Sequence, residues 1–160
     1  YEICLSDWSS DVCSSDLRNL VYTLEPGNAN ENFAGFIRSY VERLKHTGKF
    51  NLTLELDPTW PMIRVDQSLN LQAIFTEWMT NMIRHSQATE IRITLRRRAK
   101  DFALAVSDDG RGFRWNGSRA GSGLRNIALR AGLMNARVFV RRRHADHGAI
   151  FYLRGRLLDD

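Results

Sequence analysis

The sequence has little cysteine, little proline and no long apolar run, and each shortage excludes a class of protein. Its 160 residues include two cysteines, Cys4 and Cys13, and three prolines. Both cysteines lie within the first 17 residues, so the rest of the chain has neither a disulfide framework nor a thiolate metal site. No stretch approaches the roughly 18 apolar residues of a membrane-spanning helix, and no signal peptide is present. We therefore expect a cytoplasmic domain, and any anchor in the inner membrane would belong to a part of the parent protein upstream of this sequence.

The first 17 residues, YEICLSDWSSDVCSSDL, differ from the remainder of the chain. They resemble the translation of an indexed adapter used in short-read sequencing, so we interpret residues 1–17 as a non-native leader and exclude them from the fold. Without the four acids of this leader, 23 basic residues face 14 acidic ones, and the net charge rises from +5 to +9. With 43% hydrophobic residues the chain can bury one good core, which we assign to a single domain over residues 28–158.

Hydrophobic periodicity predicts three helices and five strands after the leader. Helical spacing runs from Phe33 to Leu44 after capping residues at 28–31, then from a cap at Asp66 or Ser68 through Ile83, and finally from Leu124 to Met134. Alternating apolar residues mark strands at 50–56, 91–96, 102–107, 138–140 and 151–153. Strands that follow one another without a helix argue against a doubly wound parallel sheet. The order predicts an α+β fold, with a mixed or antiparallel sheet and helices packed on one face.

The strand that ends at Val106 is followed by two acids and two glycines. Asp108 and Asp109 lie beside Gly110 and Gly112, where the backbone can turn tightly and approach a ligand without a Cβ in the way. Either carboxylate could accept a hydrogen bond from the exocyclic amine of adenine. An ordinary β-turn uses the same residue types, so this segment alone does not identify a nucleotide site.

The longest predicted helix carries a polar stripe beside its apolar face. Glu77, Asn81 and Arg84 are spaced at i, i+4 and i+7, and His85 follows. A carboxylate and a carboxamide placed in this way can hold Mg²⁺, which prefers oxygen ligands and is usually completed by water and by substrate phosphates. Arg84 and His85 could reach those phosphates. The alternative is a solvated helix face with no ligand.

A second glycine cluster, Gly121-Ser-Gly123-Leu-Arg-Asn126, opens the last predicted helix. The N–H groups at a helix N-terminus suit a phosphate. The cluster lacks the third glycine of a dinucleotide fingerprint, because Asn126 stands in its place. No Gly-x-x-x-x-Gly-Lys-Ser/Thr motif occurs in the chain, so it is not a P-loop NTPase.

In this order and spacing, the three motifs resemble the ATP-binding catalytic domain of bacterial two-component sensor histidine kinases, within the superfamily of gyrase, Hsp90, histidine kinases and MutL (GHKL). Residues 77–88 are similar to the N box, residues 108–113 to the G1 box and residues 121–126 to the G2 box. The branch it most resembles contains the nitrate-sensor and DegS/LiaS-like kinases. The resemblance implies a two-layer α/β sandwich of the GHKL (Bergerat) type. It also implies that residues 18–27 are the end of a dimerisation helix and a linker.

The resemblance assigns roles to particular residues. Asn81 would ligate Mg²⁺, and Glu77 would help to position the metal or the attacking group. Asp108 would bind the adenine amine, and residues 114–120 would form a short ATP lid. The nucleotide-binding set implied in this way is Asn81, Arg84, His85, Asp108, Gly110, Gly112, Gly121, Gly123 and Leu124.

The resemblance further implies Mg-ATP as cofactor, a response regulator as partner, and a homodimer formed through a dimerisation domain that this sequence lacks. Ser122 replaces a histidine common in this branch, and Met134-Asn135 replaces a usual glycine pair. None of the four histidines lies in a suitable phosphoacceptor helix, so this fragment would present ATP without phosphorylating itself on the usual histidine.

Two other hypotheses remain open. One is a degenerate domain of the same fold that makes protein contacts without ATP. The other is a nucleic-acid-binding module, suggested by the charge of +9 and by the runs at 96–98 and 141–143, although few aromatic residues interleave with those arginines. We expect no nucleic acid partner.

Overall fold

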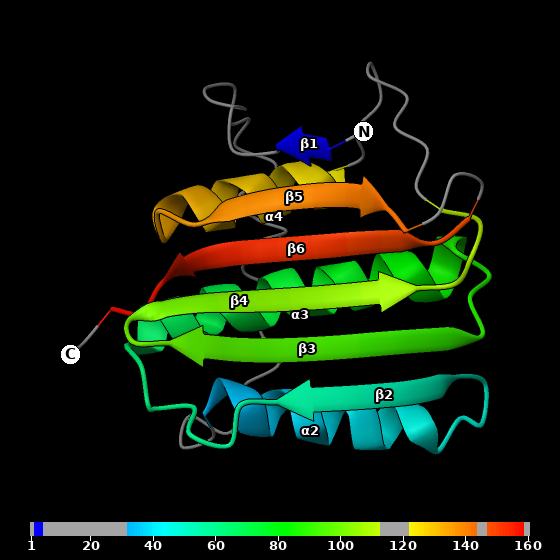
Figure 1. Cartoon of the computed structure of the whole chain (residues 1–160), viewed down its shortest axis with the longest axis horizontal. Coiled ribbons are helices and arrows are strands. Elements are labelled where there is room, and N and C mark those ends of the chain that lie inside the picture. The colour runs from blue at the N-terminus through cyan, green and yellow to red at the C-terminus, as the bar shows by residue number, and fades with distance from the viewer. Residues whose placement is uncertain (1, 5–31, 113–121, 144–146, 159–160) are drawn as a thin grey trace.

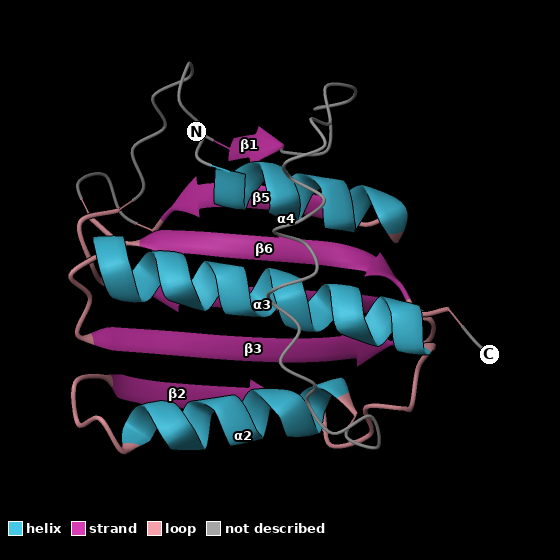
Figure 2. Ribbon diagram, turned by 180° about the vertical axis from the view of Figure 1, so that it is seen from behind, coloured by secondary structure: helices cyan, strands magenta, loops and turns pink. Residues whose placement is uncertain are grey.

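The computed structural model of the chain describes residues 2–4, 32–112, 122–143 and 147–158. In this part of the chain a six-stranded sheet forms one layer and three helices form the other, all on one face of the sheet (Figures 1 and 2). This confirms the predicted α+β sandwich. The expectations for residues 18–27, for the cap at 28–31 and for the lid at 114–120 lie outside the described residues.

The elements follow the predicted order, with one addition. The helices are α2 (Phe33–Lys45), α3 (Val65–His85) and α4 (Ser122–Leu133). The strands are β1 (Glu2–Cys4), β2 (Asn51–Leu56), β3 (Glu90–Arg98), β4 (Asp101–Asp108), β5 (Arg137–Arg142) and β6 (Ala149–Arg156). The added strand is β1, which lies in the leader and was not predicted. It pairs antiparallel with β5 at one edge of the sheet.

The sheet is mixed and mostly antiparallel, in the order β1-β5-β6-β4-β3-β2. Only β2 and β3 are parallel among the paired strands of the described residues, because α3 connects them and returns the chain to the same end of the sheet. The pairs β3–β4 and β5–β6 are antiparallel and adjacent in sequence. This topology is the mixed sheet that the strand order predicted.

The first two described helices begin differently from the prediction. Asn32 caps α2, and its side chain accepts a hydrogen bond of 2.9 Å from the N–H of Gly35. Helix α3 begins at Val65, one residue before the predicted cap Asp66, and has no side-chain cap. Asp66 lies instead in the first turn, where its charge suits the helix dipole and pairs with Arg64 at 2.9 Å.

Helix α3 supplies much of the core between the layers. Its buried apolar residues are Leu71, Ile74, Phe75, Trp78, Met79 and Met82. They pack with the inward residues of β3, β4 and β6 in one hydrophobic cluster. The prediction that Ile83 completes this apolar face is wrong. Ile83 is 37% exposed, because it lies at the edge of the buried face around the helix axis.

The end of α4 explains the replaced glycine pair. Asn135 adopts a φ of 50°, in the left-handed region that glycine usually fills. The N–H of Asn135 donates to Gly132 at 3.0 Å, and the N–H of Ala136 donates to Ala131 at 2.9 Å. This is the hydrogen-bond pattern of a Schellman motif. Asparagine tolerates this conformation, so the turn forms without the glycines.

None of the helices in the described ranges combines the length and hydrophobicity needed to cross a bilayer.

Candidate functional site

The predicted motifs meet at one end of the sheet. The end of β4, the end of β5 and the start of β6 lie there together with the last turn of α3 and the first turn of α4, on the right in Figure 1. Hydrogen bonds and close backbone contacts between these elements hold the site together.

Asp108 is the buried acid of this site. The residue is 1% exposed, and its Oδ1 accepts a hydrogen bond of 2.8 Å from the N–H of Gly110. Burial raises the pKa of Asp108, and the neighbouring carboxylate of Asp109 adds to this shift. Backbone hydrogen bonds from Gly110 and Ala149 and the charge of Arg143 oppose it without cancelling it. A carboxylate with few partners in a buried position is suited to a ligand that donates hydrogen bonds.

Asp109 has a different role, because its carboxylate is used within the protein. It accepts hydrogen bonds from the N–H of Thr89 at 2.8 Å, the hydroxyl of Thr89 at 2.7 Å and the N–H of Glu90 at 2.8 Å. Desolvation raises the pKa of Asp109, but these hydrogen bonds together outweigh it, so the pKa is below its ordinary value. Of the two acids that the sequence left open, Asp109 ties β4 to β3, and Asp108 remains for a ligand.

Gly110 lies directly against the residue that ends α3. A Cβ at position 110 would collide with the carbonyl group of Ser86, so only glycine fits without movement of the backbone. The same carbonyl accepts a hydrogen bond of 2.8 Å from the N–H of Arg111. The hydroxyl of Ser86 in turn donates to Met82 at 2.8 Å. The described part of the G1 box, residues 108–112 (the G1 segment), is therefore fixed to the end of α3.

Gly148 fixes the same segment from the other side. Its N–H donates to the carbonyl of Gly110 at 2.6 Å, and its own carbonyl accepts from the N–H of Arg143 at 3.1 Å. Gly148 has a φ of 74°, and a Cβ there would lie 2.7 Å from the carbonyl oxygen of Asp108. Gly112 has a φ of 78° and lies beside Gly148. These glycines let three backbone segments meet next to Asp108.

Glu77 and Asn81 lie one turn apart on α3, and both are partly buried. Glu77 lies against Gly123 in the first turn of α4: a Cβ at position 123 would overlap its carboxylate. Asn81 precedes Ser86 by five residues, or about 7.5 Å along the helix axis. The structure therefore brings the N box next to the start of α4 and next to the G1 segment.

For the remaining predicted residues that the structure describes, it shows which element carries them and how exposed they are. Arg84 and His85 lie in the exposed last turn of α3, at the end of the helix that faces the site. Leu124 is 6% exposed and belongs to the hydrophobic core. Gly121 lies outside the described residues. The nucleotide contacts expected of these four residues, and of the other predicted site residues, stay predictions.

Comparison with known proteins assigns the family. The model of a family described as "Histidine kinase-, DNA gyrase B-, and HSP90-like ATPase" matches residues 66–157, which is more than half of the chain. The chain belongs to this family. As a histidine kinase-like ATPase domain it has ATP as its ligand, and the match begins in the first turn of α3 and ends just after β6.

Individual relatives agree with this assignment. The sensor histidine kinase ComP of Bacillus subtilis is 37% identical over 68 residues, which are 42% of this chain and 8% of ComP. A histidine kinase domain from the blue-light activated histidine kinase of Erythrobacter litoralis superimposes with a TM-score of 0.66 at 17% identity, over 89% of this chain and 70% of that one. The histidine kinase AdeS of Acinetobacter baumannii gives a TM-score of 0.66 at 16% identity, over 89% and 76%. These structural matches show the fold, and the chain spans only a small part of ComP.

Sequence reasoning missed three contributors to the site of this ATPase domain. Ser86 and Gly148 hold the G1 segment, and Thr89 anchors Asp109. Gly148 left a signal, since a lone glycine between a basic strand end and an apolar strand is typical of a special backbone conformation. Ser86 and Thr89 contact residues that are close in space but about 20 positions away in the sequence, so no local pattern marks them.

Proposed function

We propose that this domain is the catalytic domain of a sensor histidine kinase and binds ATP at the end of β4. The observation that carries the proposal is the buried carboxylate of Asp108, framed by the backbone of Gly110, Ser86 and Gly148. A buried carboxylate beside glycines is suited to accept a hydrogen bond from an amine that approaches the backbone closely. Family membership makes the adenine amine of ATP the expected donor.

In this proposal the phosphates extend from Asp108 toward α3 and the start of α4. Gly121 and Gly123 would lie at the phosphates, where the absence of a Cβ at position 123 already leaves space for the side chain of Glu77. The N–H groups of the first turn of α4 would donate to phosphate oxygens. Arg84 and His85 would add positive charge from the last turn of α3.

The residues near the phosphates fit Mg²⁺. Glu77 and Asn81 offer one carboxylate and one carboxamide oxygen from the same face of α3. Within the described ranges no group of three or more His, Cys, Asp or Glu could hold a metal alone, so phosphate oxygens and water would have to complete the coordination. When bound, Mg²⁺ would neutralise charge on the phosphates during transfer.

The chain's own residues would position ATP for attack by a histidine outside this sequence. The fixed G1 segment would orient the base, and Glu77 would hold the metal or the attacking group, so that the γ-phosphoryl faces the acceptor. The acceptor histidine would lie on a dimerisation domain of a homodimer. The phosphoryl group would then pass to an aspartate of a response regulator.

Calorimetric titration of the full chain with Mg-ATP tests the proposal. We expect binding in the micromolar to millimolar range and a loss of about tenfold or more in the variant Asn81→Ala, because a metal ligand is removed. Gln72→Ala is a matched control, since Gln72 lies on the same helix about two and a half turns before Asn81. It should bind like the wild type.

The same titration distinguishes the proposal from the hypothesis of a degenerate domain that does not bind ATP. A folded chain that does not bind Mg-ATP would support a degenerate interaction domain and contradict the proposal. A loss of the same size in both variants would mean that the effect arises from α3 as a whole and not from a metal ligand.

A further inference from the structure

We propose that the helix-free face of the sheet carries a docking groove for an acidic, extended segment of a partner protein. The groove lies on the face that Figure 1 shows in front, opposite the three helices. It is independent of the ATP site, which is built at one end of the sheet. The arginine run at 96–98, which the nucleotide site does not use, forms part of it.

The floor of the groove is the central strand β4, where small residues face outward. Ala103 and Ala105 are only partly buried and alternate with the buried Leu104 and Val106. The register places Ala103 between Arg96 on β3 and Arg154 on β6. The longer side chains of β3 and β6 therefore project above the small residues of β4 and form the two walls of the groove.

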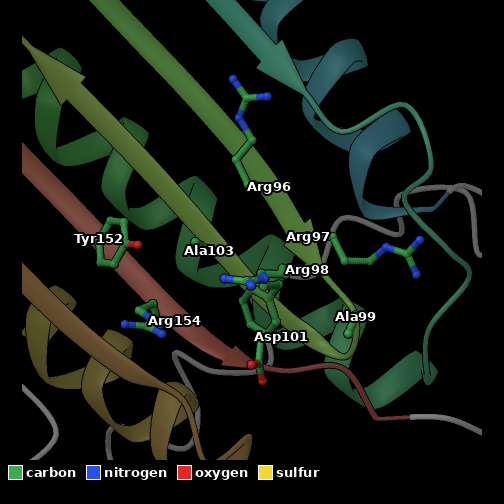
Figure 3. Close-up of a pocket in the computed structure, with 9 residues that line it drawn as sticks. Arg96, Arg97, Arg98, Ala99, Asp101, Ala103, Tyr152 and Arg154 are labelled. Atoms are coloured by element: carbon green, nitrogen blue, oxygen red, sulfur yellow. The ribbon is translucent and has the colours of Figure 1, made fainter.

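The hollow formed in this way has a volume of about 520 Å³. Figure 3 shows Arg96 on one side of Ala103, and Tyr152 and Arg154 on the other. Strands β3 and β6 are separated by β4, so the walls stand about 9.6 Å apart. One extended peptide fits this width.

Positive charge dominates the lining. The charged residues around the hollow are Arg96, Arg97, Arg98, Arg154 and Asp101. The side chain of Arg97 points away from the others and donates to the hydroxyl of Thr59 at 3.3 Å, so the charge of the groove comes from the remaining arginines. Arg96 pairs with Glu55 on β2 at 2.8 Å, at the outer rim. Within the described residues, no carboxylate lies at ion-pair distance from Arg98 or Arg154. The groove thus exposes guanidinium groups that an acidic ligand can neutralise.

The placement of the charges selects the ligand. Arginines stand on both walls, and an extended peptide projects successive side chains to opposite sides, so consecutive carboxylates would meet both walls. A single nucleic-acid strand carries its phosphates along one side. It would also need an open aromatic face for its bases, whereas Tyr152 is partly buried and its ring already contacts Phe139, with centroids 6.4 Å apart.

The test is fluorescence anisotropy of the full chain with a fluorescein-labelled peptide of ten glutamates, at about 50 mM salt. The variant reverses one charge on each wall, Arg98→Glu with Arg154→Glu. The matched control reverses the same number of charges away from the sheet face, Arg38→Glu on α2 with Lys49→Glu, both exposed. Thermal melts and Mg-ATP titration establish that each variant is folded with its nucleotide site intact.

We expect the peptide to bind the wild type and the control within about twofold of each other. The groove variant should bind it at least about tenfold more weakly, because charge reversal at the exposed Arg98 and Arg154 turns two attractions into repulsions. Equal weakening by both variants would overturn the proposal in favour of net charge alone. Tighter binding of a ten-nucleotide oligothymidine than of the peptide, lost in the groove variant, would overturn it in favour of nucleic acid. Absence of peptide binding to the wild type would also overturn it.

Discussion

At the scale of single residues, the two adjacent acids of the G1 segment show how environment divides the roles of identical side chains. Asp109 satisfies its carboxylate with three hydrogen bonds from Thr89 and Glu90, and its pKa falls. Asp108 is buried with fewer partners, and its pKa rises. A buried charge that the protein itself satisfies only in part destabilises the ligand-free fold and favours a ligand that donates to it.

The variant Asp108→Asn should separate the effect of this carboxylate on ligand binding from its effect on the stability of the ligand-free fold. Mg-ATP affinity should fall by about 10- to 100-fold, because backbone N–H groups of Gly110 and Ala149 already hydrogen-bond this side chain, and the amide nitrogen that replaces one oxygen can only donate and cannot accept the adenine amine. Calorimetric titration measures this loss.

Thermal melts as a function of pH check the second effect. Since the pKa of Asp108 is raised in the fold, ionisation of this group lowers the stability of the wild type as the pH rises above the ordinary value of 3.8 and through the raised pKa. The asparagine variant lacks this contribution. The melting temperature of the variant relative to the wild type should therefore increase by a few degrees between pH 4 and pH 7. A constant difference in melting temperature between the two proteins over that range would contradict the conclusion that burial raises the pKa of Asp108.

At the scale of elements, α3 connects the core to the site. Its apolar stripe is buried against the sheet, and its last turns carry Glu77, Asn81 and Ser86 to the G1 segment and to α4. At its other end the buried Gln67 donates to the carbonyl of Arg156 at 2.7 Å and accepts from the N–H of Leu158 at 2.9 Å. One helix thus positions the site residues relative to both ends of the sheet.

The turn after α4 gives a prediction at this scale. Asn135→Ala should lower the free energy of unfolding by about 0.5 to 1 kcal/mol, because alanine is disfavoured at a φ of 50°, and Asn135→Gly should leave it unchanged or raise it slightly. Gly132→Ala is the control within the helix: a Cβ there meets no atom within 4 Å, so stability should rise by about 0.5 to 1 kcal/mol. Urea denaturation measures all three variants, and equal stability of Asn135→Ala and Asn135→Gly would show that this turn is not a strained left-handed one.

At the scale of the whole molecule, the leader adds one short strand to a sheet that is otherwise complete. Strand β1 has three residues and pairs only with β5, whereas the five strands β2 to β6 and the three helices enclose the hydrophobic cluster. The family match over residues 66–157 includes none of the leader. We therefore expect residues 1–17 to contribute nothing to nucleotide binding.

Deletion of residues 1–17 tests this expectation. The melting temperature should change by no more than a few degrees, since the loss of three edge-strand pairings is small beside the buried core, and Mg-ATP affinity should be unchanged. Melts and titrations of the two chain lengths provide the comparison. Unfolding of the shortened chain would contradict the interpretation of the leader as non-native.

The sequence by itself determined the elements of the described chain and the local chemistry of its motifs. The period of 3.6 in α3 and the alternation in β3 and β4 are local signals, because burial on one face constrains neighbouring residues directly. The resemblance of the three boxes then identified the ATPase fold. The first residues of the helices were less predictable, as the missing side-chain cap of α3 shows.

The residue types alone left both acids of the G1 segment open and the family resemblance favoured Asp108, but only the tertiary structure shows that Asp109 is used within the protein and what surrounds both acids. The surroundings of these acids depend on Ser86 and Thr89, which lie close together between α3 and β3, and on Gly148, which lies about 60 residues further along the chain. All three meet the G1 segment through hydrogen bonds. The tertiary structure likewise revealed that the arginines of β3 and β6 face each other across Ala103. Contacts between residues far apart in sequence depend on strand register and helix placement, and no local pattern of residue types encodes them.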